Sequence, residues 1–355
     1  MHARVAMKTP AEASPGAVVL FGSGETSRVG REALRWLEGV GRAPRSIAVL
    51  ETPAGFEPNA DAVARRWTDF LARQPEARGA EVMQLPLRRR GTTQSTDLPD
   101  LARPLLGADL IALGAGSPTY TVRQLRESVT WRYLQAAHLS GASVFLASAS
   151  AIAAGSFALP VYEIYKVGDD PHWIDGLGLF ESYGLFLVVV THWDNSDGGE
   201  QLDTSRCFMG RERFDALGAL LPASAVVVGI DEHTALALDP EHGTARVLGH
   251  QGGVSVLREG REDRHAAASS FPLTVLGPFA LPARDAVVPS EVAEAIATAR
   301  STDVAPPADV AALVASRERA RDARDWPTAD RLRRELAARG WAIDDTPDGP
   351  RPHRA

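Results

Sequence analysis

Cysteine is almost absent from the sequence, since Cys207 is the only one among 355 residues. A single cysteine cannot close a disulfide within the chain, and it cannot build a cysteine-based zinc cluster. Long hydrophobic runs are missing too. The apolar stretch from Leu185 to Val190 is far shorter than the roughly 20 residues that a membrane-spanning helix needs. We therefore expect a cytoplasmic protein without a membrane partner.

A surplus of positive charge is also lacking. The chain carries 38 Lys and Arg against 45 Asp and Glu, a formal net charge of −7. This balance does not provide the electrostatic footprint of a protein that binds nucleic acid or anionic membranes over its whole surface. The first residues lack the apolar centre of a secretory signal, so we expect residues 1–15 to be a disordered leader. The 45% hydrophobic composition is enough for a large buried core.

Short apolar runs alternate with helical patterns along the first part of the chain. The runs predict strands at 17–21, 46–50, 81–85, 110–113 and 143–147. Apolar residues at helical spacing between them predict helices at 31–40, 60–73, 101–106 and 120–139. Strands that are apolar on both faces and alternate with helices are typical of a mostly parallel sheet covered on both sides. The predicted fold class is therefore α/β, a three-layer sandwich.

A strand-rich region and a polar tail follow. Strands are predicted at 185–190, 225–230, 234–238, 245–248 and 254–257, as a meander that extends the sheet. We assign the α/β domain to residues 16–300, a Pro-containing linker to 301–308 and a C-terminal appendage to 309–355. The appendage holds ten Arg and nine Asp and Glu, and its sparse apolar stripe predicts a helical hairpin.

Turns of small residues follow three of the predicted strands, at 22–24, 114–117 and 147–151. In an open parallel sheet, ligands bind outside the carboxyl ends of the strands. Ser148 stands in the last of these turns with alanine on both sides, which leaves room for a substrate beside a nucleophilic hydroxyl. Ser150 has the bulkier Ile152 two positions further on. The alternative is structural: both serines let a helix pack closely on the sheet.

A nucleophilic serine needs a histidine that accepts its proton. His192 follows the apolar run that ends at Val190, so it stands at a strand end that faces the same crevice. His172 and His233 lie in polar loops and are the alternatives. No His-x-His or His-x-x-x-His spacing indicates a metal site. We expect neither a metal nor a cofactor.

From about Val18 to Leu257 the chain resembles the serine peptidase family of dipeptidase E and cyanophycinase, which has a glutamine amidotransferase-like, flavodoxin-like fold. The segment LASASA at 146–151 is similar to the family's nucleophile motif, and Ser148 falls on the nucleophile. The resemblance implies that His192 is the base. It also implies that backbone N–H groups of Gly116 and Ala149 stabilise the oxyanion.

The same resemblance suggests which residues bind the substrate and orient the histidine. The segment GIDEHTAL is similar to a family segment near the site, and the expected substrate-binding set is Ser117, Arg123, Asp231 and Glu232. The acid that orients the histidine is expected shortly after the serine. Glu163 lies 15 positions after Ser148, and Asp169 and Asp170 are the alternatives.

The resemblance implies a serine hydrolase that cleaves peptide or isopeptide bonds beside an acidic, aspartyl residue through an acyl-enzyme on Ser148. Leu146 and Ser150 stand where the family motif has glycine, and glycine adopts the backbone angles of a tight turn most easily. The first alternative is therefore a catalytically degenerate member of the same fold that acts as a binding module.

The tail resembles a second family. Residues 310–351 are similar to the extreme C-terminus of cysteinyl-tRNA synthetase, as in the segments ADRLRREL at 329–336 and IDDTPDG at 343–349. The sequence has neither the zinc ligands nor the HIGH-type signature of a synthetase, so the chain is not expected to charge tRNA. A further alternative function is RNA association, with tRNA as the partner of residues 309–355. Packing of this hairpin on the main domain or on a partner is the other interpretation, and a homodimer stays open.

Overall fold

The computed structural model describes residues 14–282, 288–300, 308–346 and 349–354. The chain divides into two compact units, with the boundary between Ala299 and Arg300. Most of the leader expected at 1–15 and of the linker expected at 301–308 lies outside the described residues. Each unit has its own hydrophobic core.

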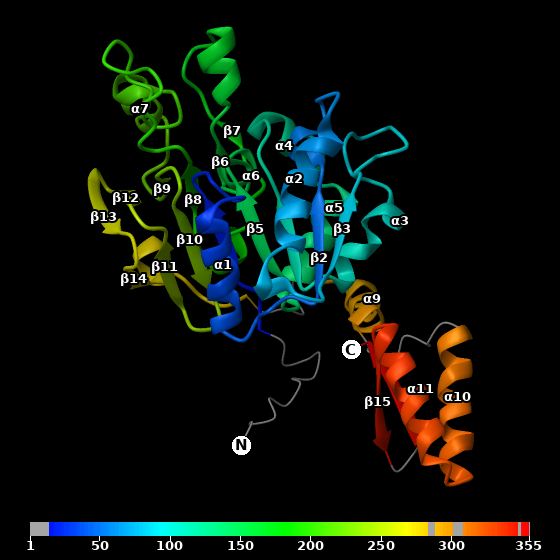
Figure 1. The fold of residues 1–355 in the computed structure, drawn as a ribbon. Helices are drawn as coiled ribbons and strands as arrows, with labels where there is room; N and C mark the ends of the chain where they lie inside the picture. The colour runs from blue at the N-terminus through cyan, green and yellow to red at the C-terminus, as the bar shows by residue number, and fades with distance from the viewer. Residues whose placement is uncertain (1–13, 283–287, 301–307, 347–348, 355) are drawn as a thin grey trace. The chain divides into compact units, whose positions relative to one another are not determined.

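An eight-stranded sheet forms the centre of the first unit, with the strand order β14-β11-β10-β1-β5-β4-β2-β3 (Figure 1). Its strands are β1 (Val18–Phe21), β2 (Ser46–Leu50), β3 (Glu81–Leu85), β4 (Leu110–Leu113), β5 (Ser143–Ala147), β10 (Ala235–Asp239), β11 (Thr244–Leu248) and β14 (Ser270–Pro272). The strands β1 to β5 are parallel, whereas β10 pairs antiparallel with β1, β11 with β10, and β14 with β11. All predicted strands of the first part are present.

Both faces of the sheet are buried at its centre, where β1, β4 and β5 are buried along their whole length. Val19 and Phe21 point to the face covered by α1 (Arg28–Gly39) and α2 (Ala60–Ala72). Val18 and Leu20 point to the other face, where α5 (Val129–Leu139) packs. This arrangement confirms the three-layer α/β fold.

The strand-rich region does not form one meander. A second, four-stranded sheet contains β8 (Leu187–Val190), β9 (Val226–Ile230), β12 (Gly253–Arg258) and β13 (Arg261–Ala266). The chain therefore crosses between the two sheets after β9, after β11 and after β13. Within the second sheet, Gly229 of β9 lets the Trp193 ring pack closely, since a Cβ there would lie 2.3 Å from that ring. Hydrophobic periodicity and β-propensity indicate where a strand forms, but they do not determine which sheet that strand joins.

The helix predicted at 120–139 is two helices, α4 (Pro118–Leu125) and α5. Glu127 between them has a φ of 59°, which interrupts the helix, and the Ser128 hydroxyl accepts the Trp131 N–H as a new cap. The helix predicted at 101–106 is instead α3 (Pro99–Ala102) followed by the 3₁₀ turn η4 (Arg103–Gly107). Pro104 lacks the N–H that a continuing α-helix would use.

The remaining elements of the first unit are short. They are α6 (Ala149–Ala153), α7 (Gly210–Gly218), α9 (Ser290–Arg300), the strand pair β6 (Phe157–Ala158) and β7 (Ile174–Asp175), and the turns η2 (Thr52–Ala54), η3 (Pro75–Ala77), η5 (Glu163–Val167), η6 (Glu181–Tyr183) and η7 (Leu273–Leu276). Several of them, such as β6, β7 and β13, have too few apolar residues in alternation to be predicted from the sequence.

The second unit contains the two predicted helices, α10 (Ala308–Asp322) and α11 (Trp326–Ala338). An antiparallel strand pair that the sequence analysis does not predict follows them, β15 (Trp341–Thr346) and β16 (Gly349–Arg354). Gly340 makes the turn between α11 and β15 with a φ of 74°. A small core of Val310, Val314, Leu336, Trp341 and Ile343 joins the helices to the first strand.

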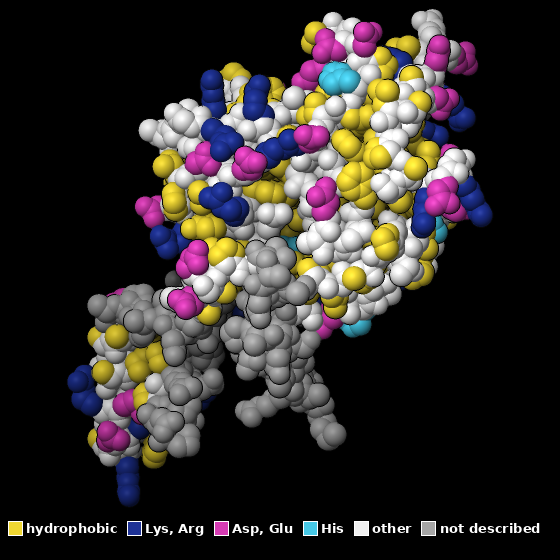
Figure 2. Space-filling view, turned by 180° about the vertical axis from the view of Figure 1, so that it is seen from behind, with side chains coloured by type: hydrophobic (Ala, Val, Ile, Leu, Met, Phe, Trp, Pro, Cys, Tyr) yellow, Lys and Arg dark blue, Asp and Glu magenta, His cyan; other side chains and the backbone are white. Residues whose placement is uncertain are grey.

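Charged side chains of both signs are interspersed over the back of the first unit, with hydrophobic ones between them (Figure 2). This distribution agrees with the modest negative net charge of the chain. In the part of the chain that the structure describes, no helix is both long and apolar enough to cross a membrane.

Candidate active site

Ser148 lies at the sharp turn between β5 and α6. Its backbone has φ 52° and ψ −111°, a conformation that side-chain-bearing residues rarely adopt. Ser150, one of the two non-glycine positions of the motif, is buried and its hydroxyl donates to the Leu113 carbonyl oxygen at 2.6 Å. The other, Leu146, is a core residue of β5. The turn therefore forms without glycine at either position.

The structure brings Ser148 and His192 together. The Ser148 Oγ lies 2.9 Å from Nε2 of His192, which follows β8 in the second sheet. His192 has a φ of 50°, and the Cys207 N–H donates to its carbonyl oxygen at 3.1 Å. The alternatives do not reach this position: His172 is bonded to the Asp170 carbonyl oxygen, and His233 contacts the turn at Gly24. A proton can therefore pass directly from Ser148 to His192.

The acid that contacts His192 in the structure is Glu232, which was expected to bind substrate, and not Glu163. His192 Nδ1 lies 2.8 Å from Oε1 of Glu232, in the turn between β9 and β10. Glu163 begins η5, and its Oε2 is buried without a hydrogen-bond partner within the part of the chain that the structure describes. Sequence distance from the serine is a poor guide here, because the acid lies 40 residues beyond the histidine.

Asp231, expected to bind substrate, is a structural residue. Its side chain is buried and forms an ion pair with Arg264, and Oδ2 accepts the Gly253 N–H at 2.8 Å. The carboxylate thereby ties β9 to the β12–β13 pair, and its hydrogen bond with Arg264, together with its charge, raises the pKa of that guanidinium. A carboxylate engaged by two partners is not presented to a ligand.

The Gly-rich turn after β4 adjoins the serine. Because Leu113 pairs with Leu146 in the sheet, the turn and Ser148 leave the same sheet edge as neighbours. Gly116 has a φ of 156°, and a Cβ there would lie 1.9 Å from the Pro53 carbonyl oxygen, so only glycine fits. Ser117 is largely buried, and its hydroxyl caps α4 by accepting the Tyr120 N–H.

Ala149 is the first residue of α6, so its N–H has no acceptor within the helix. This N–H belongs to the residue directly after Ser148, the candidate nucleophile. The N-terminus of a helix favours a developing negative charge. The backbone can therefore supply a donor at this point.

A cavity of about 170 Å³ opens beside the Gly-rich turn. Its lining includes Glu25, Glu51, Pro53, Trp67, Gly114 and Ala115. Burial raises the pKa of Glu25 above its usual value, while a backbone hydrogen bond and the nearby His192 act in the opposite direction. The sequence analysis missed Glu25, although it directly follows the glycine turn at 22–24. Glu51 is engaged by Arg88 and Gln84.

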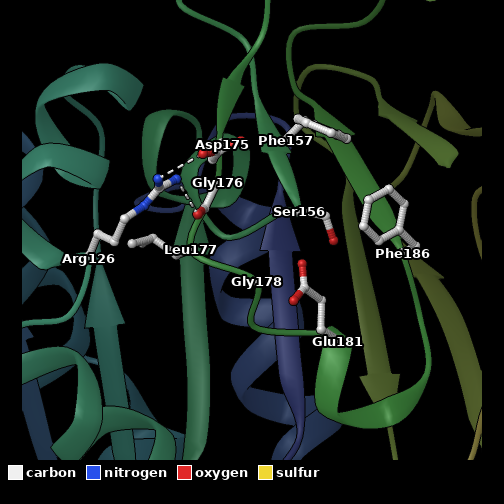
Figure 3. A pocket seen from close by; sticks show the side chains of 9 residues that line it. All are labelled: Arg126, Ser156, Phe157, Asp175, Gly176, Leu177, Gly178, Glu181 and Phe186. Carbon is white, nitrogen blue, oxygen red and sulfur yellow. Dashed lines mark hydrogen bonds and ion pairs between the residues drawn. The ribbon is translucent and has the colours of Figure 1, made fainter. Parts of the chain in front are cut away.

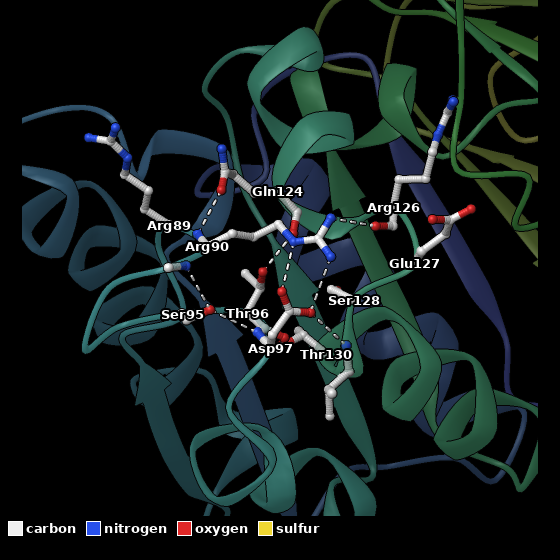
Figure 4. A network of polar contacts seen from close by, with 12 residues as sticks. Arg89, Arg90, Ser95, Thr96, Asp97, Gln124, Arg126, Glu127, Ser128 and Thr130 are labelled. Carbon is white, nitrogen blue, oxygen red and sulfur yellow. Dashed lines mark hydrogen bonds and ion pairs between the residues drawn. The ribbon is translucent and has the colours of Figure 1, made fainter.

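A polar network fastens the loop after β3 to α4 (Figure 4). The Arg90 N–H donates to the Gln124 side chain at 2.8 Å, and its guanidinium pairs with Asp97 at 2.7 Å. Arg89 points away from this network. Arg89 and the exposed Arg123, which lies 5.2 Å from the Tyr120 ring, both oppose the rise in the pKa of Tyr120 that burial causes. Arg123 thus lies beside Tyr120, and the charge of Arg89 acts on the same residue.

A second hollow, of about 430 Å³, shares no lining residue with the Ser148 cluster. In it the Ser156 hydroxyl and the Glu181 carboxylate turn toward each other, and Arg126 pairs with Asp175 at its edge (Figure 3). The described residues contain no group of three or more His, Cys, Asp and Glu arranged to hold a metal ion. Burial raises the pKa of the Cys207 thiol to about 12, so it stays protonated.

The two units of the chain are similar to different known proteins. A crystal structure of a peptidase from an acI-B1 Actinobacterium is similar to the chain, with a TM-score of 0.58 and 22% sequence identity. The similarity covers 73% of this chain and 97% of that one. At this identity the likeness concerns the fold, and it confirms the fold that the dipeptidase E resemblance implies.

The tail is similar to part of another family. The model of the cysteinyl-tRNA ligase anticodon binding domain matches residues 303–349. The cysteine–tRNA ligase of Rubrobacter xylanophilus is 61% identical over 44 residues, which are 12% of this chain and 9% of that protein. Cysteine–tRNA ligase 1 of Burkholderia lata is 51% identical over 45 residues, 13% of this chain and 10% of that protein. The chain thus spans about a tenth of the length of these relatives.

Proposed function

We propose that the chain is a serine hydrolase that cleaves peptide or isopeptide bonds beside an acidic, aspartyl residue. The observation that carries the proposal is the continuous contact from Ser148 to His192 and on to Glu232, at 2.9 and 2.8 Å. These distances are within the range of hydrogen bonds between a nucleophile, a base and an orienting acid. The strained turn at Ser148 supports the same role.

In the proposed reaction, His192 Nε2 takes the proton of the Ser148 hydroxyl as its oxygen attacks the substrate carbonyl carbon. The negative oxygen that forms is stabilised by N–H groups of Ala149 and Gly116. His192 then gives its proton to the leaving amine, and an acyl-enzyme remains on Ser148. Water, deprotonated by His192, releases the acid product. Glu232 holds the imidazole in the tautomer that accepts at Nε2.

The preference for an acidic residue rests on charge. Arg123 lies 5.2 Å from the ring of Tyr120, which α4 carries just beyond the Gly116 turn, and the charge of Arg89 acts on the same tyrosine. A carboxylate on the substrate can pair with an exposed guanidinium there, in a bidentate manner. Aspartyl dipeptides should therefore be hydrolysed faster than dipeptides with a neutral residue in the same position.

Labelling with a fluorophosphonate, which reacts with activated serines, tests the nucleophile. We expect the wild type to be labelled and Ser148→Ala to be silent. Ser143→Ala is the matched control, because Ser143 is buried in β5, the strand that precedes Ser148, and its hydroxyl has no hydrogen-bond partner among the described residues. Absence of label on the wild type would instead favour the degenerate binding module.

A second function, tRNA association through residues 309–355, is favoured by the match to an anticodon binding domain. The described part of this stretch has exposed arginines on and before α11, among them Arg324, Arg333 and Arg334. Arginines of this kind contact phosphates in protein–RNA complexes. Binding of tRNA as a function of salt concentration tests this proposal.

A further inference from the structure

We propose that Asn195 is a positioning residue that holds the Glu232 carboxylate against His192. The inference rests on the proposed function and extends it to a residue outside the triad. Asn195 Nδ2 donates to Oε1 of Glu232 at 3.1 Å, the same oxygen that faces His192 Nδ1. One carboxylate oxygen thus receives two donors, which limits its rotation.

The orientation of the Asn195 amide follows from its partners. Its Oδ1 accepts the backbone N–H of Asp197 at 3.2 Å. A backbone N–H can only donate, so the oxygen must lie on that side and the NH₂ group must face Glu232. The side chain is only 3% exposed. A buried amide with both ends engaged has little freedom to turn away.

The turn that carries Asn195 also binds the backbone of Glu232. Asp194 Oδ1 accepts the Glu232 N–H at 2.7 Å, and the Trp193 N–H donates to the Ile230 carbonyl oxygen at 3.1 Å. The Asn195 N–H closes the turn onto the His192 carbonyl oxygen at 3.2 Å. His192 and Glu232 come from distant parts of the chain, and this turn fixes one relative to the other.

Other charged groups lie near this cluster. Arg206 donates to the Trp193 carbonyl oxygen on the same turn at 3.2 Å, and Asp231, directly before Glu232, pairs with Arg264. Asp194 lies on the turn itself, Glu25 acts on His192 across the site, and the buried, protonated Cys207 interacts with Glu232. None of them donates to Oε1 of Glu232 in the described part of the structure. Loss of the Asn195 amide would therefore leave His192 as the only donor to that oxygen.

The test compares labelling rates of the full-length chain with a fluorophosphonate across pH. We expect Asn195→Ala to lower the rate roughly 10- to 100-fold, as loss of a supporting hydrogen bond does at metal-ligand sites. Asn195→Asp keeps the shape but adds a negative charge beside Glu232. That charge favours the protonated imidazole, so the acidic limb of the pH profile should shift about one unit to higher pH.

Gln74→Ala is the control for the loss of a buried amide. Gln74 is 5% exposed and bonds the Arg31 side chain and the Phe70 carbonyl oxygen, near the start of β3 and away from the strand ends that carry the site. It should lower the melting temperature without changing the pH profile. Asn195 variants that behave like Gln74→Ala would overturn the inference while Ser148→Ala stays silent. Labelling of Ser148→Ala would overturn the proposed function and, with it, this inference.

Discussion

Three of the non-glycine residues with a positive φ lie in the candidate triad or directly beside it. Ser148, His192 and His233 have φ values of 52°, 50° and 51°, although none is glycine. Each such conformation costs of the order of 1–3 kcal/mol and persists only when its surroundings hold it. Here the strain points the Ser148 hydroxyl at His192, and His233 follows the acid directly. At the residue scale, geometry at the site is maintained at the expense of stability.

Ser148→Gly should therefore be more stable than Ser148→Ala. Glycine adopts the observed φ and ψ without a steric penalty, whereas alanine retains the Cβ that makes them unfavourable. We expect a difference of about 1 kcal/mol in the free energy of unfolding, because the greater freedom of unfolded glycine offsets part of the relief. Urea unfolding of the two variants measures it. Equal stabilities would mean that the turn is not strained.

At the scale of elements, α5 is attached to the rest of the unit by a buried histidine. His138 Nε2 lies 2.7 Å from the Tyr183 hydroxyl of η6, and Nδ1 lies 3.2 Å from the Ala142 carbonyl oxygen. The side chain is fully enclosed, and burial lowers its pKa from 6.5 to about 4. The packing of α5 therefore favours the neutral imidazole of His138.

Acid should weaken this attachment. The pKa of His138 is lower in the folded than in the unfolded state, so the unfolded chain binds the extra proton between about pH 6.5 and pH 4. Because of His138, the free energy of unfolding should decrease as the pH falls through this window, by about 2 kcal/mol at pH 5. His138→Gln, which does not titrate, should show a smaller decrease in unfolding free energy between pH 7 and pH 5. An unchanged pH dependence would contradict the assignment.

At the scale of the whole molecule, the chain combines two units with separate cores and different relatives. The first carries the candidate triad, and the second carries the proposed tRNA contacts. The net charge of −7 opposes general attraction of RNA, so binding must come from local arginines. We therefore expect the second unit to account for salt-dependent binding of tRNA.

The double variant Arg324→Glu, Arg333→Glu should weaken tRNA binding and flatten its salt dependence. Each lost phosphate contact reduces the slope of log affinity against log salt by about one. Filter binding at several salt concentrations measures both quantities. Arg78→Glu with Arg103→Glu, on exposed positions of the first unit, makes the same change in charge and should leave binding unaffected. An equal effect of both pairs would indicate non-specific attraction.

Much of the fold could be predicted from local pattern. The five parallel strands and their covering helices follow from apolar runs and helical spacing, because burial on both faces leaves a direct trace in the sequence. Helix ends are harder to predict, because nothing in the hydrophobic periodicity of residues 120–139 indicates the break at Glu127. The crossing of the chain between two sheets depends on pairing partners, which a single strand does not encode.

By itself, the sequence determined the parallel α/β core and the small-residue turn at Ser148, since both are local properties. Only the tertiary structure decided the partners of that turn. It paired His192 with Glu232 instead of Glu163, engaged Asp231 with Arg264, and used the Ser117 hydroxyl as a helix cap. These choices depend on how distant strand ends meet in space. Spacing along the chain carries no such information, because loops of any length can join the same two strands.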